Sequence, residues 1–280
     1  MSGSLLDAVS DVAALAGAEA LKHFRGRLEV EAKLDGSPVT RADRDAERVV
    51  RTWVESRFPD DGILGEEFGE TRPHAARRWL VDPVDGTRAF ITGVPLWGTL
   101  VAVAEGEHVL AGAAEFPALG ERLIAARGQG CWWNGARCHV SDVATLAEAT
   151  VLATDVGFHR SPERGVRWRA LSIRAANART WGDCYGYLLV AIGRAELMVD
   201  GHLSPWDAAA LQVAVEEAGG VFTRLERPRH RVQRRRRGDE RRARRDAAPG
   251  AGHPSVSLRA TEFQGETGRP PLRRTRRRAP

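Results

Sequence analysis

The chain has 280 residues, of which 42% are apolar, which is enough for one large folded domain or two smaller ones. Its formal charge of +5 is misleading, because residues 224–280 hold 19 arginines against 6 acidic residues and leave residues 1–223 with 23 basic and 31 acidic residues, a net charge of −8. The acidic residues 1–223 would attract cations and repel polyanions, whereas the basic tail alone would suit nucleic acid. No apolar run is long enough to span a bilayer.

The chain is predicted to begin with two helices. Residues 4–24 form the first, because Ser4 and Asp7 fit a capping pair and apolar residues recur at helical spacing. After a loop at residues 33–38, Thr40 opens a second helix that runs to about Phe58 and stops before a proline.

Short strands follow the helices. The segment 63–65 is predicted as a strand that delivers Glu66, and the segment 79–81 as a strand that delivers Asp82. Further strands are predicted at 99–104 and 109–113, as a hairpin, and at 123–126 and 131–133. These segments indicate an antiparallel sheet.

Beyond residue 143 strands and helices alternate. We expect a strand near Val151, a helix at 168–176, a helix at 185–192, a strand at 196–199 and a helix opened by Asp207. The predicted domains are therefore residues 1–143, an N-terminal α+β domain, and residues 144–223, a C-terminal α/β domain. Residues 224–280 lack apolar periodicity, so we expect an Arg-rich tail that is disordered.

Acidic residues gather at three separated places. Asp82 and Asp85 lie three residues apart where an apolar run gives way to a Gly-Thr turn, Glu66 lies upstream, and Asp207 lies downstream at the start of an Ala-rich helix. Mg²⁺ is a hard cation that prefers oxygen ligands, and the Val84 carbonyl could add another. Backbone amides of Gly86 and Thr87 could bind a phosphate oxygen. This pattern indicates a metal-dependent phosphatase.

A simpler interpretation of the same residues stays open. Asp-Pro and Asp-Gly pairs are ordinary turn formers, and Asp207 could be only a favourable charge in the first turn of its helix. Asp43, three residues after Thr40, is a fair capping residue. Lys33 could be a solvated loop lysine.

Three motifs resemble those of the inositol monophosphatase family of Mg²⁺-dependent, lithium-sensitive phosphatases, over about residues 5–223. They are the GEE element at 65–67, the WxxDPxDGTxxF element at 79–90 and the WDxAAxxxxxxEAGG element at 206–220. The resemblance implies a layered α-β-α-β-α sandwich, the sugar-phosphatase fold, and a homodimer.

The resemblance also implies roles for individual residues. Two or three Mg²⁺ ions would be held, the first by Glu66 and Asp82 and the second by Asp82, Asp85 and Asp207. Thr87 with Asp43 would help to activate the attacking water, and Lys33 would lie on a mobile loop that closes over the metals.

The substrate must be specified elsewhere in the chain. The segment 181–187, with Asp183, and the later Asp200 look like those of the branch that acts on histidinol phosphate, whose cationic leaving group acidic side chains would suit. From the sequence, Asp183 could equally cap the following helix. The leading hypothesis is histidinol-phosphatase activity in histidine biosynthesis, and the alternative is hydrolysis of inositol monophosphate or another sugar phosphate.

The tail suggests a different class of function. Its composition is what GC-rich coding sequence gives when it is read out of frame, so we hypothesise a frameshift at about Arg224 that truncates the second domain. If the tail is genuine, an inactive phosphatase body with an Arg-rich arm for nucleic acid is the alternative. An odd number of cysteines without a CxxC pair and the lack of a signal segment favour a cytoplasmic location. Besides a second copy of the chain, the expected partner is a small phosphate-ester substrate.

Overall fold

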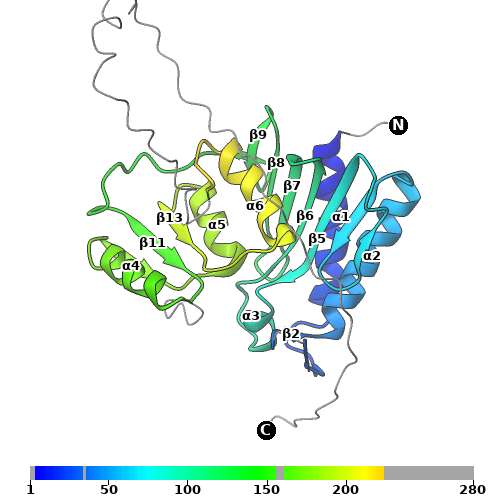
Figure 1. The fold of residues 1–280 in the computed structure, drawn as a ribbon, viewed down its shortest axis with the longest axis horizontal. Helices are drawn as coiled ribbons and strands as arrows, with labels where there is room; N and C mark the ends of the chain where they lie inside the picture. The colour runs from blue at the N-terminus through cyan, green and yellow to red at the C-terminus, as the bar shows by residue number, and fades with distance from the viewer. Residues whose placement is uncertain (1–3, 34–35, 156–160, 224–280) are drawn as a thin grey trace, which may run out of the picture. The chain divides into compact units, whose positions relative to one another are not determined.

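The computed structural model describes residues 4–33, 36–155 and 161–223 (Figure 1). The described residues up to Phe222 belong to one compact unit, and all helices and strands below lie in it. The hypotheses about residues 224–280, which are disorder, a frameshift and a nucleic-acid arm, fall outside the described residues.

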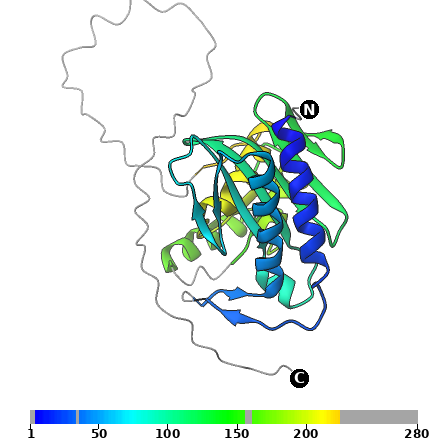
Figure 2. The same cartoon turned by 90° about the vertical axis from the view of Figure 1, so that its right-hand side faces the viewer.

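The two predicted N-terminal helices are confirmed as α1 (Leu5–Leu21) and α2 (Arg41–Arg57). Each begins with a capping box, formed by Ser4 with Asp7 in α1 and by Thr40 with Asp43 in α2. Such boxes satisfy backbone amides that have no partner within the helix. Figure 2 shows the two helices side by side against the large sheet.

The large sheet has eight strands in the order β10-β9-β8-β7-β6-β5-β3-β4. The strands are β3 (Gly62–Gly65), β4 (Gly69–Thr71), β5 (Arg77–Asp85), β6 (Gly98–Glu105), β7 (His108–Phe116), β8 (Glu121–Ala126), β9 (Gly130–Trp133) and β10 (Ala136–Cys138). All neighbours pair antiparallel except β3 and β5, which are parallel. The predicted antiparallel sheet is therefore largely confirmed, and β4 and β10 are additions to it.

The strand that carries the acidic motif is longer than predicted. It was expected to end before Asp82, but β5 continues to Asp85, with an irregular register against β6 between these two residues. Asp82 accepts a hydrogen bond from the Val84 amide, which replaces a partner lost at the irregularity. The two carboxylates thus stand on the distorted end of a central strand.

Two small elements lie near this strand end. The hairpin of β1 (Glu31–Ala32) and β2 (Pro38–Val39) carries Lys33 in its connection, and the short helix α3 (Thr87–Ile91) follows β5. None of them was predicted as a regular element, because two-residue strands and a five-residue helix leave no periodic pattern in the sequence.

The small sheet has three parallel strands in the order β12-β11-β13. They are β11 (Thr150–Ala153), β12 (Asn177–Arg179) and β13 (Leu197–Val199), and the helices of this part are α4 (Pro162–Ser172), α5 (Asp183–Ala191) and α6 (Pro205–Glu217). The predicted helix at 168–176 is displaced, because α4 begins at a proline, a residue favoured at the first helical position. The other predicted elements are present.

Alternation along the strands places helices on both faces of each sheet. In β6, Val101 and Val103 pack with α1 and α2, whereas Leu100 and Ala102 pack with α6. In β11, Val151 packs with Trp168 of α4, whereas Leu152 packs with α5.

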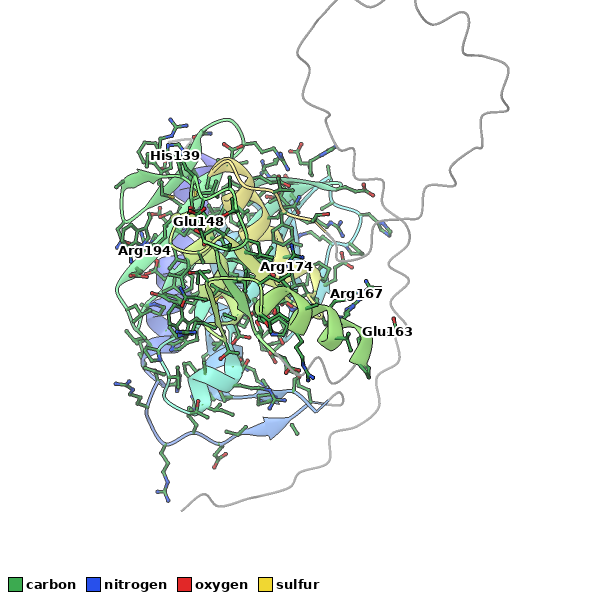
Figure 3. All side chains as sticks on the ribbon, turned by 90° about the vertical axis from the view of Figure 1, so that its left-hand side faces the viewer. His139, Glu148, Glu163, Arg167, Arg174 and Arg194 are labelled. Carbon is green, nitrogen blue, oxygen red and sulfur yellow. The ribbon has the colours of Figure 1, made fainter. Side chains whose placement is uncertain are left out.

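The layers are therefore α1 and α2, the large sheet, α5 and α6, the small sheet, and α4. This is the predicted α-β-α-β-α sandwich. Figure 3, from the side of α4, shows Glu163 and Arg167 on this outermost helix and Arg174 just after it, and all three side chains are exposed. The large sheet ends at Cys138 and the small one begins at Thr150, but a domain boundary at residue 143 stays a prediction.

Within the described residues, no helix is both long enough and apolar enough to cross a bilayer.

Candidate active site

Three carboxylates from two elements converge at the end of β5. Oxygen atoms of Asp82, Asp85 and Asp207 all lie within 4.8 Å of one another, and we call these three residues the acidic cluster. The first two come from the irregular end of β5 and the third from the first turn of α6, 122 residues further along the chain than Asp85. The fold therefore brings together residues that the sequence only suggested as partners.

The acidic cluster lacks an internal counter-charge. Burial raises the pKa of Asp82 well above its usual range, and the charges of Glu66, Asp85 and Asp207 raise it further. Burial also raises the pKa of Asp85, with added repulsion from Asp183, and that of Asp207, to about 6. Like charges held at this separation are stable only if protons or cations neutralise them.

Asp207 has two tasks. Its Oδ2 accepts a hydrogen bond of 2.7 Å from the Ser204 amide, which completes a capping box at the start of α6. Asp207 is thus an acidic residue in the first turn of α6, as the sequence indicated, and also a member of the acidic cluster. The cap fixes the carboxylate on a rigid helix, so little conformational freedom remains to be lost on binding a cation.

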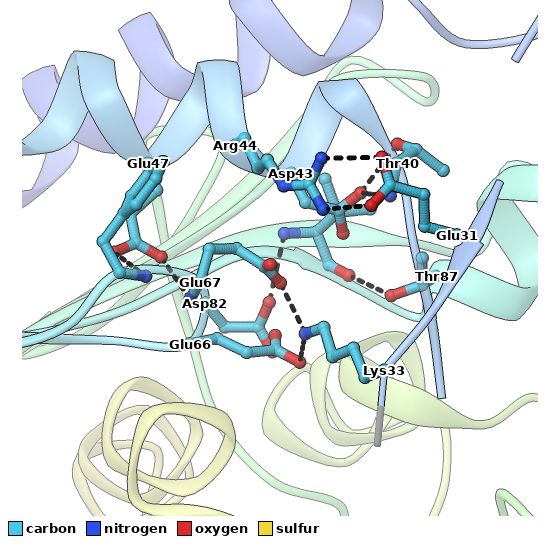
Figure 4. Close-up of polar contacts among 12 residues, drawn as sticks. Glu31, Lys33, Thr40, Asp43, Arg44, Glu47, Glu66, Glu67, Asp82 and Thr87 are labelled. Atoms are coloured by element: carbon cyan, nitrogen blue, oxygen red, sulfur yellow. Dashed lines mark hydrogen bonds and ion pairs between the residues drawn. The ribbon is translucent and has the colours of Figure 1, made fainter. Parts of the chain in front are cut away.

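Glu66 lies beside the acidic cluster and is paired with a lysine. Lys33 Nζ lies 2.6 Å from Glu66 Oε1 and 2.5 Å from Glu67 Oε1, as Figure 4 shows. Burial lowers the pKa of Lys33, but the two carboxylates outweigh this effect and raise it overall. Burial raises the pKa of Glu67 to about 7. The solvated-loop interpretation of Lys33 is therefore wrong, since its side chain is only 23% exposed.

Asp43 has one occupied and one free oxygen. Its Oδ2 accepts hydrogen bonds from the amide and the hydroxyl of Thr40, at 2.8 and 2.7 Å, which confirms the capping interpretation (Figure 4). Its Oδ1 is buried and has no hydrogen-bond partner in the described part of the chain. Burial raises the pKa of this carboxyl, and the charge of Glu66 adds to the rise, which places it near the site. A buried oxygen without a partner is costly, so this atom is available for a ligand or water.

The turn after the acidic cluster is tightly packed. Thr87 Oγ1 donates to the Val84 carbonyl at 3.0 Å, which holds the threonine beside the end of β5. Gly86 has a φ of +82°, and a Cβ there would lie 3.0 Å from the Leu96 carbonyl oxygen and 3.3 Å from Asp183 Oδ2. A glycine is therefore required at this position on both counts.

The start of α5 faces the same site. The Cys184 amide donates to Asp85 Oδ2 at 2.5 Å. Asp183 itself has a φ of +51°, an unusual backbone conformation for a residue with a side chain. The N-cap of α5 is Gly182 and no side chain caps the helix, so the alternative that Asp183 is a cap is wrong.

Asp183 and Asp200 lie together on the α5 side of the site. Burial raises the pKa of Asp183 to about 6, and repulsion from Asp200 and Asp207 contributes, while Arg88 opposes the rise. Burial also raises the pKa of Asp200, although hydrogen bonds from Thr154 and Tyr187 stabilise its charged form. The Tyr187 hydroxyl donates to Asp200 at 2.9 Å. A second patch of negative charge thus borders the acidic cluster.

The donor set fits a divalent cation. Hard carboxylate oxygens, mutual repulsion among buried acids and the unpartnered Asp43 oxygen are all features that a cation such as Mg²⁺ would satisfy.

Several contacts of the site were not predicted from the sequence. They involve Glu67, Tyr187, Arg88 and the Cys184 amide. Tyr187 could have been found, because it lies one helical turn after Asp183 and so shares its face of α5. The Cys184 amide could not, because it lies 99 residues from its partner Asp85 and a backbone amide leaves no mark in a sequence.

Comparison with known proteins gives consistent matches. The model of the inositol monophosphatase family matches residues 3–249. The histidinol-phosphatase of Chlorobaculum parvum is 46% identical over 75% of this chain and 82% of its own length, and that of Mycobacterium tuberculosis is 40% identical over 71% and 78%. The structure of an inositol monophosphatase from Zymomonas mobilis matches with a TM-score of 0.69 at 35% identity, covering 76% of this chain and 83% of that one.

Proposed function

The chain belongs to the inositol monophosphatase family and is a metal-dependent phosphoric monoester hydrolase, and we propose that it hydrolyses L-histidinol phosphate to L-histidinol and phosphate. The observation that carries this substrate is the second acidic patch, Asp183 and Asp200, beside the acidic cluster. Histidinol carries an ammonium group and an imidazole, so negative side chains would complement it. A neutral polyol carries no positive charge for these two carboxylates to complement.

We assign the metal to Mg²⁺, in two or three ions. The ions would be held by oxygen ligands, which Mg²⁺ prefers. These ligands are the carboxylates of Glu66, Asp82, Asp85 and Asp207 and the carbonyl of Val84. When bound, the ions would supply Lewis acidity to the phosphate and to the attacking water. Lys33 would compete with a metal at Glu66, since both are cations attracted to the same carboxylate.

The remaining groups would position water and phosphate. The unpartnered Asp43 oxygen can accept a proton from water, and Thr87, held by the Val84 carbonyl, can orient that water with its lone pairs. The amides of Gly86 and Thr87 would bind a phosphate oxygen. Attack by water needs no covalent intermediate on the protein.

The decisive experiment is a phosphate-release assay on the full chain. The values of kcat/KM should be compared for L-histidinol phosphate and inositol 1-phosphate, each with Mg²⁺ and with a chelator. We expect the histidinol ester to be preferred and the chelator to abolish the activity. A preference for the inositol ester would refute the proposed substrate, and metal-independent activity would refute the mechanism.

A second substrate class has support of its own. The Aquifex aeolicus and Thermotoga maritima proteins named fructose-1,6-bisphosphatase/inositol-1-monophosphatase are 30% and 35% identical. Hydrolysis of inositol monophosphate or a related sugar phosphate is therefore the alternative, and the same assay distinguishes it. The histidinol-phosphatases named above are more similar to this chain, which favours the first proposal.

Location and assembly complete the proposal. Cys131, Cys138 and Cys184 are free and buried, which suits a reducing cytoplasm. We keep the homodimer as a proposal that light scattering of the purified chain can test.

A further inference from the structure

Glu47 is a buried carboxylate on α2 that contacts the segment carrying Glu66. Its side chain is fully buried, and Oε2 accepts a hydrogen bond of 2.7 Å from the Glu67 amide. Oε1 accepts a longer bond of 3.2 Å from the Phe68 amide and an ion-pair bond of 2.8 Å from Arg51 Nε. Both oxygens are therefore satisfied, as a buried charge requires.

The residue before Glu66 is shaped to admit this carboxylate. A Cβ on Gly65 would lie 2.1 Å from Glu47 Oε1 and 2.4 Å from its Cδ, both far inside van der Waals contact. Glu47 thus packs closely against the backbone at Gly65 and accepts a hydrogen bond from the Glu67 amide. Glu66 stands between these two points, with its own amide bonded to the Val81 carbonyl of β5.

Arg51 adds a hydrogen bond at the end of the same turn. Its side chain is only 11% exposed and also donates to the Gly69 carbonyl at the start of β4. Glu47 and Arg51, one turn apart on α2, therefore hold the whole connection between β3 and β4. Figure 4 shows Glu47 reaching from its helix to the backbone beside Glu66 and Glu67.

The same chemistry occurs elsewhere in the chain without a site. Glu217 at the end of α6 accepts hydrogen bonds from the Gly128 amide, at 2.9 Å, and from the Gly130 amide, at 2.8 Å. That turn between β8 and β9 carries no residue of the candidate active site. A helix glutamate that accepts hydrogen bonds from the amides of a turn can therefore be purely structural. Glu47 differs from Glu217 because its turn carries Glu66, a residue of the candidate active site.

We propose that Glu47 is a positioning residue for Glu66, which fixes the direction of the Glu66 carboxylate toward the acidic cluster and thereby sets the affinity of the chain for divalent metal. The inference rests on the proposed metal-dependent function. Groups that orient metal ligands, without touching the metal, commonly contribute about 10-fold to 100-fold to metal affinity.

Calorimetric titration of the metal-free full chain with Mn²⁺ and with Mg²⁺ tests this role. The variants are Glu47→Gln, which replaces one acceptor oxygen by a donor facing an amide, and Arg51→Lys, which keeps the charge but loses the forked contact. The matched control is Glu217→Gln. We expect a loss of metal affinity of about 10-fold or more in Glu47→Gln, a smaller loss in Arg51→Lys and no loss in the control.

A kinetic readout separates positioning from simple stability. In Glu47→Gln the Mg²⁺ concentration for half-maximal phosphate release should rise, while kcat at saturating Mg²⁺ should recover most of its wild-type value. Thermal melts of the metal-free proteins should show both Gln variants destabilised, because each leaves a backbone amide poorly paired.

The outcomes are distinct. Wild-type metal affinity in Glu47→Gln and Arg51→Lys, together with lowered melting temperatures, would overturn the inference and leave Glu47 a structural residue. If Glu47→Gln does not fold, the metal affinity of Arg51→Lys decides. A wild-type chain that binds no divalent metal would overturn both proposals, whereas one that binds metal but hydrolyses neither ester would contradict the proposed function alone, and the titrations would still decide on Glu47.

Discussion

The ammonium group of Lys33 lies 2.6 Å from Glu66 Oε1 and 2.5 Å from Glu67 Oε1. The lysine comes from the connection of the β1–β2 hairpin, which Arg44 on α2 ties down through a two-bond contact with Glu31. A cation supplied by the chain itself therefore neutralises the carboxylates on one side of the site. The lysine on this hairpin would therefore compete with any metal that uses Glu66.

The first prediction concerns this competition. Lys33→Gln should raise the affinity for divalent metal by about threefold to tenfold, because it removes one positive charge close to the binding oxygens. Isothermal titration calorimetry with Mn²⁺ measures the change. Lys22→Gln is the control, since Lys22 pairs with Glu19 on the exposed face of α1. Unchanged or weaker metal binding in Lys33→Gln would show that the lysine does not compete.

The second prediction separates the two tasks of Asp207. Asp207→Asn keeps an oxygen that can accept from the Ser204 amide but removes the negative charge from the acidic cluster. Loss of a direct metal ligand should cost more than loss of an orienting group, so phosphate release should fall by more than about 100-fold. Asp7→Asn, the same change in the capping box of α1, should leave activity intact. Wild-type activity in Asp207→Asn, or an equal loss in Asp7→Asn, would show that the charge of Asp207 is not needed at the acidic cluster.

The third prediction concerns the leaving group. Asp183→Asn should lower kcat/KM for L-histidinol phosphate by about tenfold or more, because a cationic alcohol loses a half-buried negative partner. The value for inositol 1-phosphate should change much less. Steady-state assays with both esters measure the ratio. A parallel loss for both would show that Asp183 does not select the substrate.

The fourth prediction concerns pH. Burial raises the pKa of Asp207 and of Asp183 to about 6, above the ordinary value of a carboxyl in an unfolded chain. The metal-free folded state therefore binds protons more tightly than the unfolded state, and its stability falls as the pH rises from about 4 through about 6. For Asp207 the loss amounts to about 3 kcal/mol at most.

Thermal melts with a chelator and with Mg²⁺ test this dependence. The metal-free chain should melt at a higher temperature at pH 5 than at pH 7.5, relative to its Asp207→Asn variant, and Mg²⁺ should reverse this order by favouring the charged carboxylates. Parallel pH profiles with and without the metal would contradict it. The same experiment with Asp7→Asn controls for the loss of an exposed charge.

Local patterns in the sequence predicted much of the fold. The capping pairs Ser4 with Asp7 and Thr40 with Asp43 are found three residues apart, so both helix starts could be predicted correctly. The start of α4 also has a local signal, because Pro162 occupies the first helical position, where proline is favoured. The short strands β4 and β10 escaped notice, since three residues are too few to show alternation.

In the candidate site, too, residues within one local motif could be predicted, whereas residues linked by distant contacts could not. Asp82 and Asp85 were found because both stand in one motif, whereas Glu67 was not, because only the distant Lys33 gives it a role. The grip of Glu47 on the Glu67 amide was also invisible, since it depends on where α2 crosses β3. Contacts to backbone amides are set by packing, and a side-chain pattern does not record them.

The acidic cluster and the Asp183–Asp200 patch come from separate elements. The first stands on β5 and α6, whereas the second stands on α5 and on the chain after β13. Exchange of side chains on α5 and after β13 can therefore retune which alcohol is released, provided that the Cys184 amide keeps its contact with Asp85. A scaffold built in this way lends itself to diversification, and libraries confined to these two short stretches should yield catalysts for new esters.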